Sequence, residues 1–203
     1  MPATIREVTP GDAPRIAAGE YATAQTPGLL NAMPGEIPEA AFREKIESLQ
    51  KASRGLYAAA EIGQDIAGHV LLEPMLLAAN AHVCDLTIVV YPPWQGRGLG
   101  KQLLTYAIAW ARSNPHVEKI ELKVRASNAR ALALYRSLGF QEEGRLRKRV
   151  KERNGYLADI AMALFVDEPG TGAESIHLCR AESATVHVGW LTSTGGRRSL
   201  SIA

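Results

Sequence analysis

The feature that most constrains the fold is a glycine-rich segment, residues 95–100 (QGRGLG), between a predicted strand and a predicted helix. The β-branched residues before Tyr91 are typical of a buried strand, and apolar residues recur with helical period after Gly98. Glycine lets the backbone approach a ligand closely, and the free amides at the start of a helix attract anions. This order of elements favours a domain of mixed α and β structure that binds a phosphate group.

Two common phosphate-binding motifs do not match this segment. A Walker loop, G-x-x-x-x-G-K-[ST], would need glycine in place of Gln95 and a hydroxyl residue in place of Gln102. A dinucleotide fingerprint, G-x-G-x-x-G, would need glycine at Lys101 or Leu103. The pattern that remains is Q-x-x-G-x-G, from Gln95 to Gly100. The alternative is a plain turn, but three glycines at a helix start would each cost about 1 kcal/mol relative to alanine.

Strands and helices are predicted along most of the chain. Strands are expected at residues 4–9, 56–62, 66–76, 82–90, 119–124, 140–144 and 156–165. Helices are expected at residues 12–24, 39–53, 98–114 and 128–138. Asp12 and Asn128 are predicted N-caps, and Gly139 is a predicted left-handed C-terminal cap. The order β-α-α-β-β-β-α-β-α-β-β predicts an α+β domain built on a mixed sheet.

Composition limits the remaining classes of protein. The chain has 203 residues, 46% hydrophobic and 22% charged, as in an ordinary globular domain, and its net charge is +2. Neither Cys84 nor Cys179 lies at a metal-binding spacing. We expect a cytoplasmic protein, because no stretch is long enough to span a membrane and the first residues do not resemble a signal peptide. Residues 1–166 are predicted to form the domain, and residues 167–203 a partly disordered C-terminal appendage.

A second motif, residues 124–140 (VRASNARALALYRSLGF), follows the glycine segment. It combines a strand end, the N-capping Asn128, a helix with small residues, Tyr135 and the sequence Leu-Gly-Phe. Together the two motifs resemble the GNAT superfamily of acyl-CoA-dependent N-acyltransferases, over residues 4–166 and most closely over residues 89–140. The resemblance implies a three-layer α+β fold, with helices on both faces of a mixed central sheet that splays open at the cofactor site.

The resemblance also implies that acetyl-CoA is the acyl donor, while the spacing of the histidines gives no reason to expect a metal. The donor's pyrophosphate would lie on the amides of residues 97–101, and its pantetheine arm beside residues 88–90. Asn128 would bond the pantetheine arm as well as cap its helix. The cofactor-binding residues predicted in this way are Ile88, Val89, Val90, Gln95, Gly96, Arg97, Gly98, Leu99, Gly100, Lys101 and Asn128.

For catalysis, the resemblance implies that Tyr135 protonates the departing thiolate, although a tyrosine on an apolar helix face can also be a core residue. An amine would attack the thioester directly, and a strand amide near residues 89–90 would hold the oxyanion. A base must also take a proton from the amine. Asp85 is favoured for this role, and Glu73, His82 or a water chain are the alternatives.

Cys84 is expected to be a buried strand residue, because no Cys-His-acid grouping supports a covalent acyl-enzyme. The acceptor is expected to be a primary amine of a small molecule or an amino acid. The motif H-V-x-D, which begins at His82, and the ending R-N-G-Y-x-A-D-x-x-M-A-L are similar to bacterial amino-acid and phosphinothricin acetyltransferases. Residues 125–140 are instead similar to the acetyltransferases of ribosomal-protein N-termini. A protein or peptide N-terminus is therefore the alternative acceptor.

Five cations would share one face of a strand in the basic run at residues 145–153. They suggest an acidic partner, or they are simply the solvated side of a hairpin. A non-catalytic module that uses this run to bind nucleic acid is a further alternative, and the two cofactor motifs argue against it. No membrane partner is expected. A homodimer is the oligomer to test, since relatives are often dimers.

Overall fold

The computed structural model describes residues 3–26, 30, 32–152 and 155–166. The strands are β1 (Thr4–Glu7), β2 (Leu56–Ile62), β3 (Asp65–Pro74), β4 (Val83–Val90), β5 (Lys119–Arg125), β6 (Gln141–Glu152) and β7 (Gly155–Phe165). The helices are α1 (Ala13–Ala24), α2 (Glu39–Lys51), α3 (Leu99–Ser113) and α4 (Ala129–Ser137), with short 3-10 turns at Pro10–Asp12, Ala78–Asn80 and Pro92–Trp94. This order confirms the predicted α+β arrangement.

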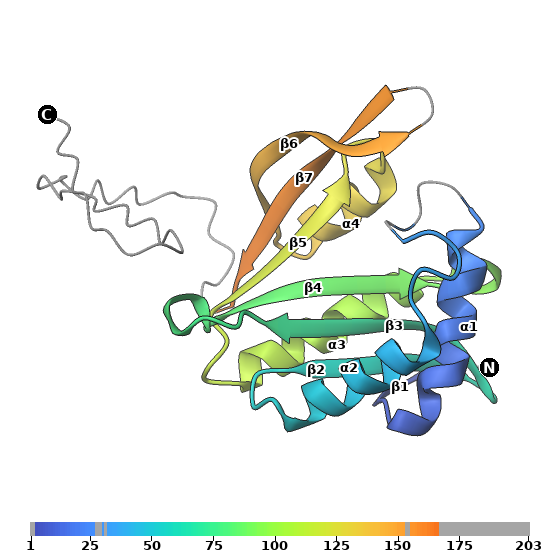
Figure 1. Cartoon of the computed structure of the whole chain (residues 1–203). Coiled ribbons are helices and arrows are strands. Elements are labelled where there is room, and N and C mark those ends of the chain that lie inside the picture. Colours follow the sequence, from blue (N-terminus) through green and yellow to red (C-terminus); the bar gives the residue numbers. More distant parts are fainter. Residues whose placement is uncertain (1–2, 27–29, 31, 153–154, 167–203) are drawn as a thin grey trace, which may run out of the picture. The chain divides into compact units, whose positions relative to one another are not determined.

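The strands form one mixed sheet in the order β1-β2-β3-β4-β5-β7-β6, with helices on both faces (Figure 1). Successive side chains of a strand point to opposite faces, so each central strand serves two cores. Tyr57 and Leu71 pack on one face against α1 and α2. Leu56 and Leu72 pack on the other face, with Leu103 of α3 and Leu132 of α4 in the same core. The predicted three-layer fold is confirmed.

The last hairpin differs from the prediction. The strand expected at residues 140–144 begins at Gln141 and runs to Glu152, paired with β7. The cationic residues obscured the alternation of apolar and polar residues from which strands were predicted, so the sequence indicated a shorter strand. Such residues are tolerated in β6 because it lies at the edge of the sheet, where charged side chains reach solvent. The pairing shifts between Leu146 and Val150, where Lys148 has a φ of 53°, so the strand is irregular at this point.

Asp12 acts differently from a simple N-cap. It stands before α1, but its side chain makes no capping hydrogen bond to that helix. The buried carboxylate accepts hydrogen bonds from the amide of Thr9 (2.8 Å), from Arg6 (2.8 Å) and from Arg15. These contacts hold the pKa of Asp12 well below its usual range, and the hydrogen bond from Arg6 lowers it most. Asp12 therefore connects β1 to α1.

The strands β4 and β5 pair only over residues 83–85 and 119–121 of the described chain. Beyond these pairs the two strands diverge (Figure 1). Within the described part of the chain, no helix has the length and apolar character that a membrane crossing requires. The appendage predicted at residues 167–203 lies outside the described residues.

Candidate active site

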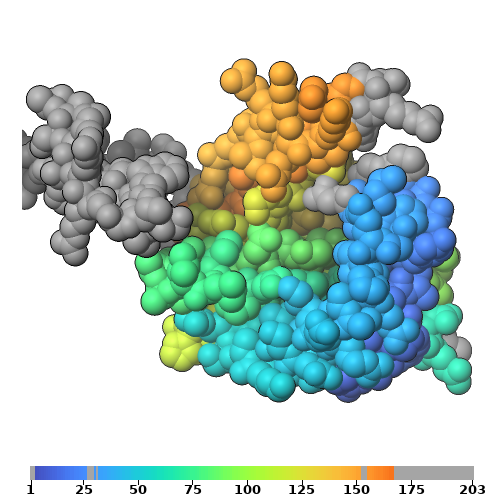
Figure 2. Space-filling model, in the orientation of Figure 1, coloured from blue at the N-terminus to red at the C-terminus, as the bar shows by residue number. Residues whose placement is uncertain are grey.

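The divergence of β4 and β5 opens a cleft of about 670 Å3. Figure 2 shows the surface hollowed between the green strands and the yellow and orange strands, beside the blue N-terminal helices. The glycine segment and the start of α4 line one part of the cleft, and residues from α1 to Ile37 line another. Both sequence motifs on which the resemblance rests therefore line the cleft. An N-terminal region that neither motif contains lines it as well.

The backbone of β4 turns alternate residues toward this opening. Tyr91 donates its amide to Ala67 of β3, and Met75 donates to Val83, so the odd-numbered residues of β4 form the ladder with β3. The amides and carbonyls of Ile88 and Val90 consequently face the opening, whereas those of Val89 face β3. The side-chain amide of Gln95 donates to the carbonyl of Val90 (2.9 Å) and so ties the glycine segment to the strand end.

The glycine segment has a backbone that other residues rarely adopt. Gly96 and Gly98 have φ angles of 81° and 80°, in the left-handed region that favours glycine. Gly98 precedes the first residue of α3, so the amides of residues 99–101 have no carbonyl partner within the helix. Leu99, Gly100 and Lys101 line the cleft, and the positive end of the helix dipole lies at their amides.

Cationic side chains surround the same loop. Arg97 lies over the ring of Trp94, 5.0 Å from its centroid. A methyl group placed on Gly96 would lie 3.9 Å from Nη2 of Arg130, so this α4 residue reaches the loop. Lys101 and Arg130 both line the cleft. Free amides, a helix dipole and cations suit a nucleotide pyrophosphate. Among the described residues, no group of three or more His, Cys, Asp or Glu could hold a metal ion.

The second motif positions α4 along the cleft. The side chain of Asn128 accepts a hydrogen bond from the amide of Ala131 (3.0 Å), which confirms the predicted N-cap. Gly139 ends the helix with a φ of 95°, as predicted for a left-handed cap. Tyr135 lines the cleft, and its ring packs edge-on against Phe140 with 5.6 Å between centroids. Burial raises the pKa of Tyr135 to about 12, so its hydroxyl is protonated at neutral pH.

The base candidates named from the sequence do not line the cleft within the described part of the chain. Asp85 pairs with Lys123 of β5 (3.2 Å). Glu73 lies opposite Asp85 in the β3–β4 ladder and pairs with Lys45 of α2. His82 precedes β4, and its carbonyl accepts the amide of Glu118. The assignment of Asp85 as the base remains a prediction.

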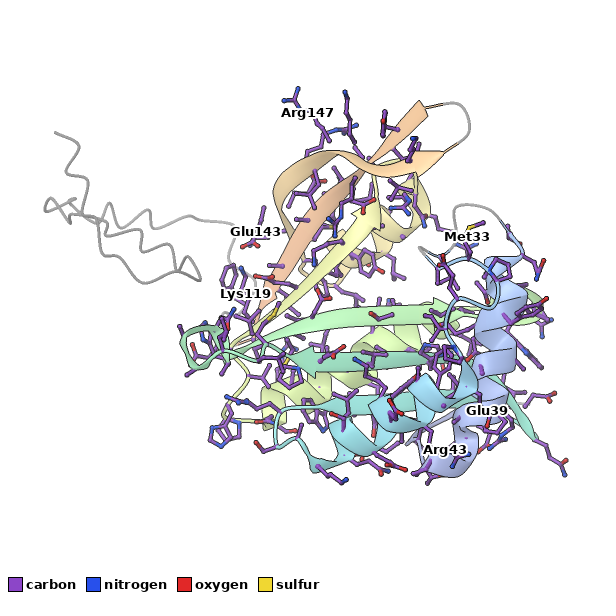
Figure 3. All side chains as sticks on the ribbon, in the orientation of Figure 1. Met33, Glu39, Arg43, Lys119, Glu143 and Arg147 are labelled. Carbon is purple, nitrogen blue, oxygen red and sulfur yellow. The ribbon has the colours of Figure 1, made fainter. Side chains whose placement is uncertain are left out.

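Cys84 is buried, and its thiol donates to the carbonyl of Arg54 (3.4 Å). Burial raises the pKa of this thiol to about 11, so it is not a thiolate at neutral pH. The basic run is exposed at Arg145, Arg147, Lys148, Arg149 and Lys151, and Arg153 lies outside the described residues. Arg147 projects from β6 away from the sheet (Figure 3).

Two lining residues of α1, Glu20 and Thr23, were missed by the sequence reasoning. Leu30, Ala32 and Ile37, which lie between α1 and α2, line the cleft as well. No local pattern points to Glu20 and Thr23, because they reach the cleft through the packing of α1 over β3.

Comparisons with known proteins agree with this geometry. The acetyltransferase (GNAT) family model matches residues 26–140. The chain is 34% identical over 154 residues to the N-alpha-acetyltransferase RimI of Mycobacterium tuberculosis, which covers 76% of this chain and 87% of that protein. It is 33% identical over 98 residues to the L-amino acid N-acetyltransferase AaaT of Escherichia coli, a match that spans 48% of this chain and 60% of that protein.

Among solved structures, yncA of Salmonella typhimurium with its cofactor acetyl-CoA has a TM-score of 0.74 at 20% identity, over 86% of this chain and 99% of that chain. This likeness supports the fold. Two other matches show the family itself. The family model covers more than half of the chain, and the Mycobacterium tuberculosis protein is matched over most of its length. The chain belongs to the acetyltransferase (GNAT) family, and the acetyl-CoA-dependent N-acetyltransferase class predicted from its sequence is confirmed.

Proposed function

We propose that this protein transfers an acetyl group from acetyl-CoA to a primary amine of a small molecule or an amino acid. The observation that carries the proposal is the cleft between β4 and β5, which places the glycine segment, the start of α4 and Tyr135 along one continuous surface. Acetyl-CoA supplies the thioester carbonyl that the amine attacks.

The residues proposed to hold the donor fit its chemistry. The amides of residues 97–101, with Arg130 beside Gly96, are suited to the pyrophosphate. The amides and carbonyls of Ile88 and Val90 face the opening and are suited to the amide groups of the pantetheine arm. Of these groups, the N–H of Val90 is the one suited instead to the thioester oxygen. Val89 lines the cleft as well, while its backbone groups pair with β3.

Tyr135 is proposed to donate its hydroxyl proton to the departing sulfur. A thiol with a pKa of about 8.5 leaves readily when a neighbouring acid supplies a proton. The raised pKa of Tyr135 keeps that proton available across the neutral and mildly alkaline range. The ring of Tyr135 also packs edge-on against Phe140.

The acceptor is proposed from the relatives. The similarity to an L-amino acid N-acetyltransferase supports a free amino acid. The second candidate is a peptide N-terminus, favoured by the match to the N-alpha-acetyltransferase RimI over a larger share of the chain. Both acceptors present an α-amino group, but a free amino acid carries a carboxylate beside it and a peptide carries an amide. We further propose that the protein acts in the cytoplasm.

A thiol-release assay with acetyl-CoA distinguishes these acceptors. The panel contains the twenty L-amino acids, two simple alkyl amines and tripeptides that begin with alanine or serine. We expect turnover with at least one free amino acid or alkyl amine. Turnover with tripeptides alone would select the second candidate. Acetyl-CoA binding without turnover on any amine would indicate a non-catalytic module.

A further inference from the structure

A buried histidine next to the cleft has no part in the function proposed above. His69 lies on β3, and its side chain is 1% exposed. Its ring contacts three titratable groups from three other parts of the fold: Tyr57 of β2, Tyr91 after β4 and Glu20 of α1. Glu20 lines the cleft, and its side chain is 13% exposed. The cluster therefore leads from the protein interior to the cleft.

Close packing holds Tyr91 in this cluster. A methyl group on Gly19 would lie 2.1 Å from the ring of Tyr91, so glycine is required for α1 to pack there. The hydroxyl of Tyr91 donates to the carbonyl of Ile16 (3.3 Å) and lies 2.9 Å from Nδ1 of His69. Burial, followed by the charges of Tyr57 and Glu20, raises the pKa of Tyr91. This hydroxyl therefore keeps its proton at neutral pH.

The position of the ring proton on His69 is linked to the direction in which the Tyr91 hydroxyl donates. The hydroxyl of Tyr91 has one proton, and in the arrangement in which it donates this proton to Ile16 it accepts a hydrogen bond from Nδ1–H of His69. The neutral ring then has its lone pair on Nε2, which lies 3.2 Å from Oε1 of Glu20. Despite this short distance, Nε2 has no aligned hydrogen-bond partner among the described residues. A lone pair and a carboxylate that face each other form a site able to take up one proton.

We propose that Glu20 and His69 accept the proton that the amine substrate must lose, an inference that rests on the proposed function. The ammonium form of the acceptor gives one proton to the carboxylate of Glu20, and Glu20 passes it to Nε2 of His69. The amine keeps the electron pair of the broken N–H bond and becomes a neutral nucleophile. His69 becomes an imidazolium beside the carboxylate, with Tyr91 still accepting from Nδ1. As the tetrahedral adduct collapses, the second proton lost by the nitrogen replaces the one that Tyr135 gives to sulfur, and release of the His69 proton to solvent restores the starting state.

Asp85, the base favoured from the sequence, has a different environment. Its carboxylate is paired with Lys123, and it does not line the cleft of the described chain. Among the described residues that line the cleft, Glu20 is the only carboxylate. Glu20 also lies on α1, which lines a part of the cleft outside the two cofactor motifs.

The test compares Glu20→Gln and His69→Gln with wild type across a range of pH. The substrate is whichever amine of the panel above is fastest, and kcat/KM is measured from about pH 6.5 to about pH 9.5, a range over which the neutral fraction of an amine rises steeply. The matched control is Glu39→Gln, which removes a carboxylate on the surface of α2 (Figure 3). Calorimetric titration with acetyl-CoA verifies that each variant folds and binds the donor.

We expect Glu20→Gln to lose about 10²-fold in kcat/KM at pH 7, as removal of a general base does. The loss should shrink steadily toward the highest pH, because a much larger fraction of the amine is then already neutral. His69→Gln should follow the same trend, and Glu39→Gln should match wild type throughout.

A loss in Glu20→Gln that stays constant with pH, or no loss, would overturn this inference and leave the proposed function standing. If His69→Gln fails to fold, the Glu20→Gln profile alone decides. A wild-type protein that binds acetyl-CoA but acetylates no amine would overturn the proposed function, and this inference with it.

Discussion

Replacing Gly100 by alanine is expected to make the protein more stable and its binding of acetyl-CoA weaker. Gly100 lies in the first turn of α3, where alanine stabilises a helix by about 0.5–1 kcal/mol relative to glycine. The new methyl group would lie 3.5 Å from Cδ2 of Leu134 and 3.8 Å from Cγ2 of Val90, which are ordinary contact distances. The substitution therefore brings no clash, and we expect the free energy of unfolding to rise.

The same methyl group would occupy space in the cleft, since Gly100, Leu134 and Val90 all line it. We expect the Kd for acetyl-CoA to increase at least about tenfold, which corresponds to about 1.4 kcal/mol of binding free energy. Urea unfolding measures the first quantity and calorimetric titration measures the second. Tight binding in a stabilised Gly100→Ala variant would refute the idea that glycine is needed here for a ligand.

Two further glycines separate backbone effects from binding effects. Gly98 and Gly63 both have left-handed φ angles, 80° and 65°, and no atom would contact an added methyl group within 4 Å. Alanine at either position should lower the free energy of unfolding by about 1 kcal/mol, because a side chain disfavours this conformation. Gly98 lines the cleft, whereas Gly63 lies in the β2–β3 turn. We expect Gly98→Ala to weaken acetyl-CoA binding and Gly63→Ala to leave it unchanged.

Three other substitutions test separate parts of the structure. Tyr135→Phe should lower kcat about 10²-fold and leave the Kd for acetyl-CoA unchanged, because it removes the acid and keeps the ring contact with Phe140; equal kcat values would remove the acid role. Cys84→Ala should keep wild-type turnover in the thiol-release assay, since a thiol with a pKa of about 11 is not the nucleophile, and a loss above tenfold would argue otherwise. Asp12→Asn should lower the free energy of unfolding by about 2 kcal/mol at pH 7 in urea, because charged hydrogen bonds to Arg6 and Arg15 are lost. The folded-state pKa of Asp12 lies below that of the unfolded chain, so this stabilisation is complete above about pH 4 and disappears as the pH falls further. Wild type and Asp12→Asn should therefore converge in stability toward low pH, and a difference that does not depend on pH would contradict this account.

Local patterns in the sequence were sufficient for most of the fold. Helical period and caps predicted α3 and α4, and Asn128 and Gly139 take the conformations expected of them. The prediction treated all three loop glycines as costly helix residues. Only Gly100 lies inside the helix, whereas Gly96 and Gly98 occupy left-handed conformations that glycine favours. Glycine is therefore favoured in this segment for two separate physical reasons. Gly96 and Gly98 have a left-handed backbone, and Gly100 leaves space that the ligand is expected to need.

The sequence by itself determined the order of the elements, the two cofactor motifs and the family they resemble, because each depends on residues close together in the chain. Only the tertiary structure decided where β4 separates from β5 and which backbone groups face the opening. It also brought Glu20, His69 and Tyr91 together from α1, β3 and the end of β4. Such contacts depend on how α1 packs over the sheet, and periodicity within one segment carries no information about that packing.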